Sequence, residues 1–93
     1  MRSSDTQIQG TPKDYSSDLY RVTFEVAESN GAAKTILSDF LGPDHSRKLI
    51  ALPHGYQCEL PMQCIPELVR NLTMANIAVY QVIRHEQAQG EWQ

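Results

Sequence analysis

Hydrophobic and polar residues follow two different periods along this chain. Strict alternation from Tyr20 to Val26 predicts a strand that buries one face and exposes the other. Apolar residues spaced as i, i+3, i+4 and i+7 predict two helices, each with one apolar stripe. The two stripes consist of Ala33, Ile36, Leu37 and Phe40, and of Ile65, Leu68, Val69, Leu72 and Ala75.

Residues with special backbone preferences mark the ends of both predicted helices. Residues 29–31 precede the first stripe, and Asn30 is suited to cap a helix N-terminus. Gly42, followed by a proline, fits the left-handed position that ends a helix. Pro66 suits the first position of the second helix, and Asn76 tolerates the left-handed φ that closes it.

Three further apolar segments predict strands. Residues 47–52 and 56–60 flank a Pro-His-Gly turn and predict a hairpin, and residues 77–84 predict a last strand. The resulting order is βαββαβ, which is the order of the ferredoxin-like fold. We therefore expect an α+β two-layer sandwich with two helices on one face of a four-stranded antiparallel sheet. The first and third strands should be central, with the second and last strands at the edges.

The polar segments at both ends predict the domain boundaries. Residues 1–18 contain a single aliphatic residue, Ile8, and predict a flexible leader or linker. Residues 19–86 hold the predicted ferredoxin-like domain. Residues 87–93 predict a loose polar tail, although Trp92 is large enough to dock back on the domain.

The last predicted strand carries the candidate interaction surface, which consists of Val79, Tyr80, Val82 and Ile83. This strand is apolar on both faces, and an edge strand of that kind associates with other chains unless it is covered. We expect a protein partner or a second copy there. The alternative is that the tail with Trp92 covers the strand.

Composition narrows the classes of function and compartment. The 93 residues carry a net charge of −3, which disfavours a nucleic-acid binder because such proteins need a basic face. No apolar run approaches the ~20 residues that cross a bilayer, and residues 1–18 lack the apolar segment typical of a secretory signal. We therefore expect a cytoplasmic protein without membrane insertion. Its cysteines, Cys58 and Cys64, are expected to be reduced and packed.

Motifs for catalysis, cofactors and metals are weak. The segment from Glu28 to Thr35 has Ala33 and Glu28 where a phosphate-binding loop needs glycines. The two cysteines lack the close spacing of zinc ligands. A small hydrolase or acid–base enzyme that uses His54 with Glu59 or Glu67 stays an open alternative. We predict no enzyme activity, no cofactor and no metal.

A family resemblance covers the second helix and the last strand. The run Ile65-Pro66-Glu67-Leu68-Val69-Arg70-Asn71-Leu72, followed by Asn76-Ile77-Ala78-Val79-Tyr80-Gln81-Val82, resembles the C-terminal accessory domain of ABC-transporter ATP-binding subunits of the bacterial drug and bacitracin export type. Those domains continue into a Ser-Leu-Glu-Asp helix that this chain lacks. The resemblance implies a non-catalytic accessory or regulatory domain that works beside an ATPase.

Two non-catalytic functions therefore compete. The first is a regulatory protein-interaction domain that pairs through its last strand. The second is a small-ligand sensor that resembles amino-acid-binding ACT domains, which share the predicted topology. Its ligand turn would be Ser29, Asn30 and Gly31, at the start of the first helix.

Overall fold

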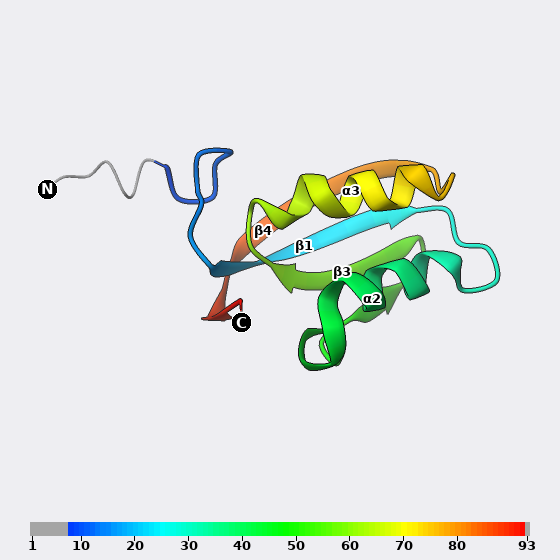
Figure 1. Ribbon diagram of the computed structural model, residues 1–93, viewed down its shortest axis with the longest axis horizontal. Helices are drawn as coiled ribbons and strands as arrows, with labels where there is room; N and C mark the ends of the chain where they lie inside the picture. The colour runs from blue at the N-terminus through cyan, green and yellow to red at the C-terminus, as the bar shows by residue number, and fades with distance from the viewer. Residues whose placement is uncertain (1–7, 93) are drawn as a thin grey trace, which may run out of the picture.

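The strands form one sheet, and both helices cover the same face of it (Figure 1). The computed structural model describes residues 8–92 of the chain. In chain order the elements are β1 (Asp18–Val26), α2 (Ala32–Ser46), β2 (Ile50–Leu52), β3 (Gly55–Leu60), α3 (Cys64–Met74) and β4 (Val79–Glu91). All pairings are antiparallel, in the order β2-β3-β1-β4. The predicted ferredoxin-like sandwich is confirmed, including which strands are central and which lie at the edges.

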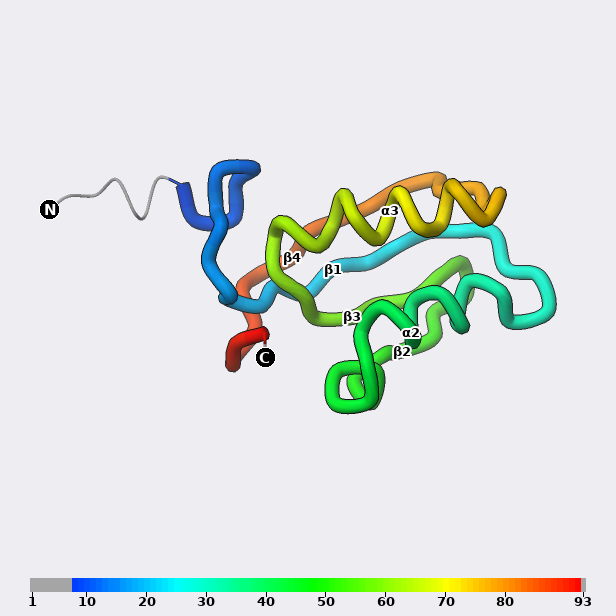
Figure 2. The backbone as a smooth tube through the Cα atoms, viewed as in Figure 1, coloured from blue at the N-terminus to red at the C-terminus, as the bar shows by residue number. Residues whose placement is uncertain are grey.

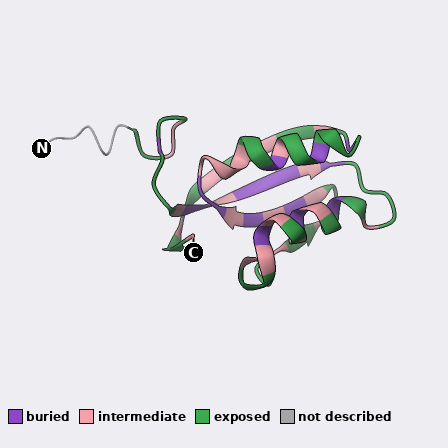
Figure 3. Ribbon diagram, viewed as in Figure 1, coloured by how far each residue is buried: buried purple, intermediate pink, exposed green. Residues whose placement is uncertain are grey.

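The core lies between the sheet and the two helices, where the buried residues in Figure 3 meet. The alternating residues of β1 face this layer, as their sequence pattern predicts. Burying a side chain as large as Phe24 contributes about 2–3 kcal/mol, so this one interface dominates stability. Its most buried large members are Phe24, Leu37, Leu60, Leu68, Leu72, Val22 and Cys58.

Helix ends agree with the sequence in part. Gly42 adopts φ 80° inside α2 and breaks the helical path, which continues as a short turn to Ser46 (Figure 2). Asn76 adopts φ 63° after α3, as predicted. The N-cap of α2 is Gly31, not the predicted Asn30, and α3 begins at Cys64, so Pro66 is not its first residue.

Strand lengths differ from the prediction at both edges. β2 contains only three residues, whereas β4 contains thirteen and ends at Glu91 instead of residue 84. Gln87 and Glu91 pair with the start of β1, so most of the predicted tail is strand. Backbone pairing requires no apolar side chains, which is why hydrophobicity did not predict this extension.

Trp92 docks on α2 and does not cover β4. Its amide donates to the carbonyl of Ser17 at 2.9 Å, which holds the end of β4 beside β1. Its ring stacks on His45 at a centroid distance of 4.4 Å and lies near Phe40. The alternative in which the tail shields the last strand is therefore not what the structure shows.

Residues 8–17 are held against the sheet by Asp14, a residue that is only 4 % exposed. Its carboxylate accepts hydrogen bonds from the amides of Gly10 and Ser16, the hydroxyl of Ser16 and the hydroxyl of Tyr20. The bond from the Gly10 amide is the main reason that the Asp14 pKa lies far below its ordinary value. Burial and the neighbouring carboxylate raise the pKa of Tyr20 to about 12.

A second contact reinforces this attachment. The side-chain amide of Gln63 donates to the carbonyls of Pro12 and Asp14, at 2.7 Å and 3.0 Å. The predicted flexible leader is therefore an ordered, docked segment over residues 8–17. Residues 1–7 of that leader lie outside the described residues.

Candidate functional site at the edge strand

Within residues 8–92, β4 has a neighbouring strand on one side only. The predicted surface is divided between the two faces of this strand. Val79 and Val82 pack partly against the core, and Ile83 lies opposite Thr23 on the face without helices. Tyr80 is 74 % exposed. The four residues thus form no single patch, and what they share is the strand itself.

Register shifts interrupt the pairing of β4 with β1 at three places, and the middle one is a bulge near His85. Gln81 to Arg84 pair one for one with Glu25 to Val22. The next paired residues are Tyr20 and Gln87, so three steps along β4 match two steps along β1. An extra residue of this kind bends the strand and disturbs the alternation of its side chains.

Side-chain contacts show what the bulge does to the faces of β4. Arg84 lies on the helix side, where its guanidinium is 5.5 Å from the centre of the Tyr20 ring. His85 and Glu86 both lie on the opposite, open face, because they contact Thr23 and Arg21 there. Gln87 pairs with Tyr20 and so returns to the helix side. The alternation of faces therefore reverses between His85 and Glu86.

The two open-face residues are fixed by polar contacts. Nε2 of His85 lies 2.8 Å from the hydroxyl oxygen of Thr23, which is only 7 % exposed. That oxygen also accepts a bond from the side-chain amide of Gln57 at 3.2 Å, which leaves the Thr23 proton free to be donated to His85. Glu86 forms an ion pair with Arg21 at 2.6 Å, and this bond lowers the Glu86 pKa.

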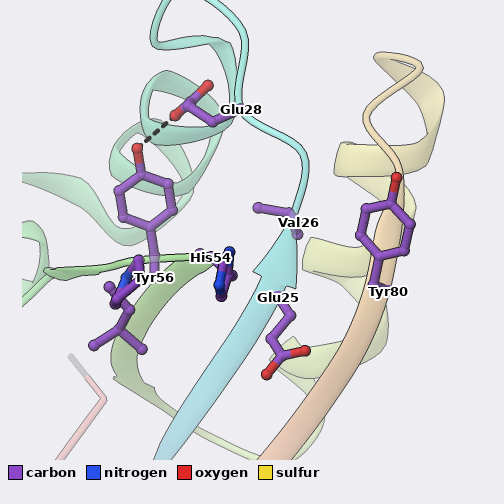
Figure 4. Close-up of a pocket in the computed structure, with 9 residues that line it drawn as sticks. Glu25, Val26, Glu28, His54, Tyr56 and Tyr80 are labelled. Carbon is purple, nitrogen blue, oxygen red and sulfur yellow. Dashed lines mark hydrogen bonds between the residues drawn. The ribbon is translucent and has the colours of Figure 1, made fainter.

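A cleft of about 590 Å³ lies at the other end of β4, where the β2–β3 turn approaches the end of β1 (Figure 4). Its lining combines two glutamates, one histidine and two tyrosines with apolar residues. Figure 4 shows the Tyr56 hydroxyl directed at Glu28, while Tyr80 stands apart on β4. The lining residues are Glu25, Val26, Glu28, Leu52, Pro53, His54, Gly55, Tyr56 and Tyr80.

The side chain of Glu28, which precedes α2, lies at the N-terminus of this helix. Its carboxylate accepts bonds from the amides of Ala33 and Lys34, at 2.9 Å and 3.0 Å, and also from Ser29 and the Tyr56 hydroxyl. Burial opposes the charge, but these bonds outweigh burial and lower the Glu28 pKa. The same contact raises the pKa of Tyr56. The carboxylate thus caps the helix in place of an N-cap side chain.

This cap bears on the predicted ligand turn. Ser29, Asn30 and Gly31 do not line the cleft, although Glu28 beside them does. The helix amides that a ligand carboxylate would use are already bound to Glu28. The structure therefore gives no support to an amino-acid site at this turn.

The remaining reactive side chains are dispersed. Burial raises the pKa of Cys58 to about 12, and it also raises the pKa of the half-buried Cys64. Among residues 8–92, no three His, Cys, Asp or Glu side chains are close enough to hold a metal ion. The three histidines lie on different parts of the fold: His45 on α2, His54 in the β2–β3 turn and His85 on β4. None of the helices in this described part is long and apolar enough to cross a membrane.

Comparisons with known proteins add no relative. No protein-family model, curated protein or solved structure matches the chain. The similarity to ABC-transporter accessory domains therefore stays a prediction.

The bulge at His85 and Glu86 is the feature that sequence reasoning missed. Its only trace in the sequence is that the apolar run of this strand ends at Ile83.

Proposed function

We propose that this chain is a non-catalytic protein-interaction domain that accepts a strand from a protein partner along the free edge of β4. The supporting observation is that the thirteen-residue β4 has one neighbour among the strands of residues 8–92. Backbone amides and carbonyls along such an edge are ready to pair with another chain, and sheet extension is a common mode of peptide and protein recognition.

Side chains at the edge add to this support. Ile83 on the open face and Tyr80 beside the cleft are apolar or aromatic groups that a partner strand would cover. Charged residues follow them, and charges near an edge restrict which partner can pair without repulsion. We therefore expect this edge to discriminate between partner strands and not to pair with any strand.

The resemblance adds a further proposal about the setting of this domain. The similar residues fall on α3 and on the first part of β4, and β4 is the strand that holds the free edge. On this proposal the domain regulates an ATP-binding transport subunit in the cytoplasm. Association measured with and without such a subunit tests this setting separately from β4 pairing.

Sedimentation velocity at rising protein concentration tests the interaction with the most accessible partner, a second copy. We expect the unmodified chain to move from monomer to dimer. Ile83→Lys should remain monomeric because it places an ammonium group in the partner interface. Ile50→Lys is the matched control, because Ile50 lies on the open face of the opposite edge and is 53 % exposed.

Thermal melting of each variant separates lost folding from lost pairing. A folded Ile83→Lys variant that dimerises as well as Ile50→Lys would refute pairing through β4. A monomer at every concentration for the unmodified chain would refute self-association, which is the form of the proposal tested here.

A further inference from the structure

We infer that residues 8–17 form a strap that limits pairing along β4 beyond Ile83 and that opens while the sheet stays folded. The inference rests on the proposed function and adds a means of regulating the same edge. Two observations support it. The strap contacts side chains of β4, and hydrogen bonds, not apolar packing, hold it in place.

The strap touches β4 at two positions on the helix side. A Cβ built at Gly10 would lie 3.2 Å from Cζ of Arg84, so the backbone of the strap packs directly on this guanidinium. The side-chain amide of Gln9 donates a hydrogen bond to the side-chain oxygen of Gln87. In Figure 1 the strap is the blue loop near the start of α3. Residues 9 and 10 therefore lie on the helix side of β4 where Arg84 and Gln87 project.

A partner strand along β4 needs the same space. Residues directly opposite each other on neighbouring antiparallel strands place their side chains on the same face, with Cβ atoms about 4.5–5.5 Å apart. Partner residues opposite Arg84 and Gln87 would therefore project toward residues 9 and 10. Because these contacts of the strap begin at Arg84, residues 79–83 stay open to a partner while the strap is docked.

Polar contacts hold the strap on the domain. The hydroxyl of Tyr20 donates to the Asp14 carboxylate at 2.8 Å, and the side chain of Gln63 donates to two backbone carbonyls of the strap. The large apolar side chains of the strap, Ile8 and Tyr15, are exposed and do not belong to the core. A segment that buries so few apolar side chains opens at a lower free energy than the core strands and helices.

Asp14 controls the docking because it has two roles in the strap. Its carboxylate joins the turns on either side by accepting bonds from the amides of Gly10 and Ser16. The same carboxylate anchors these turns to Tyr20 on β1. Loss of the carboxylate removes both the internal order of the strap and its contact with the sheet, whereas the apolar core between the sheet and the helices is left in place.

Asp14→Ala in the full chain tests whether the strap opens separately. Nuclear Overhauser effects between Gly10 and the Arg84 side chain, and between the side chains of Gln9 and Gln87, report docking directly. We expect both sets to disappear in this variant, while the effects that join β1 to β4 remain.

Sedimentation velocity of the same variant tests the effect on pairing. A partner binds fully only to the fraction of molecules in which β4 is free, so undocking should lower the apparent Kd of self-association about tenfold. Asp14→Ala combined with Ile83→Lys should stay monomeric, because the added association uses β4.

Two further variants accompany the test. Asp44→Ala is the matched control, because it removes one negative charge from an exposed side chain on α2 that pairs only with Arg47, at 3.8 Å. It should retain the docked strap and the Kd of the unmodified chain. Gln63→Ala keeps the Asp14 carboxylate and removes only the bonds from Gln63 to the strap. It should lower the apparent Kd about threefold, and it decides the outcome if Asp14→Ala does not fold.

The other outcomes would overturn the strap in distinguishable ways. An undocked strap with an unchanged or higher Kd would show that it does not limit pairing, and would leave the proposed function intact. Loss of the β1–β4 effects in both strap variants would show that the strap does not open separately. Monomers at every concentration for the unmodified chain and for both strap variants would overturn the proposed self-association as well.

Discussion

The two edges of this sheet differ in length and in the regularity of their pairing. β2 has three residues and belongs to a tight hairpin, so it offers a partner almost no backbone. β4 has thirteen residues and follows β1 along its full length, with register shifts that β2 lacks. A short edge avoids unwanted pairing by its size. A long edge still allows pairing, and its register shifts restrict which partner strands can pair along it.

The largest expected effect comes from Gly55, the first residue of β3, which follows the turn from the short edge strand β2. A Cβ added at Gly55 would lie 1.9 Å from the carbonyl oxygen of Phe24, in a place where only backbone can yield. Gly55→Ala should therefore lower the free energy of unfolding by about 3 kcal/mol. Urea unfolding measures this change. A loss below that of Gly31→Ala, whose Cβ meets open space but whose φ is 78°, would contradict the packing.

Gly55→Ala also sharpens the comparison of the edges. If β4 carries the association, the folded fraction of this variant should still dimerise with unchanged affinity. Loss of dimerisation in a folded Gly55→Ala sample would show that the short edge participates.

A smaller effect is expected from Asp14, which fixes residues 8–17 near the far end of β4. Asp14→Asn removes the charge from four hydrogen bonds and should cost about 2 kcal/mol near neutral pH. Chemical unfolding measures this loss. An unchanged stability would mean that the docked segment contributes nothing to the fold.

The pH dependence of the stability difference between the unmodified chain and Asp14→Asn gives an independent check. Hydrogen bonds hold the folded pKa of Asp14 below its ordinary value of 3.8, so the charge stabilises the folded state fully above that pH. This contribution is lost as the pH falls from 3.8 toward the lower folded pKa. The gap between the unmodified chain and Asp14→Asn should therefore narrow in acid. A gap that widens would contradict the sign.

The smallest effect is expected from Thr23, whose hydroxyl positions His85 beside the bulge. Thr23→Val should cost about 1 kcal/mol and should weaken dimerisation, because His85 loses its partner on β1. Thr23→Ser keeps the hydroxyl and should retain both properties. Sedimentation velocity compares the dimerisation of the two variants. Equal dimerisation would show that the hydrogen bond between Thr23 and His85 does not contribute to the interface.

The sequence predicted the parts of this fold that depend on apolar periodicity. The stripes of both helices and the alternation of β1 led to the correct layers and strand order, since burial of Leu37, Leu68 and Phe24 requires them. The left-handed residues Gly42 and Asn76 were also recognisable, because few residue types adopt that backbone conformation.

The parts that could not be predicted depend on polar contacts between distant segments. Asp14 organises residues 8–17 through hydrogen bonds, and Glu28 caps α2 from outside the helix. Neither contact leaves a periodic signal. The extension of β4 to Glu91 and its bulge are backbone features, so the candidate strand was predicted but its phase was not.

Amide hydrogen exchange at low and high protein concentration tests the central difference between the edges most directly. The account predicts that amides of β4 become more protected as concentration rises, whereas those of β2 exchange at the same rate throughout. Exchange in β4 that does not depend on concentration, or added protection in β2 instead, would contradict it.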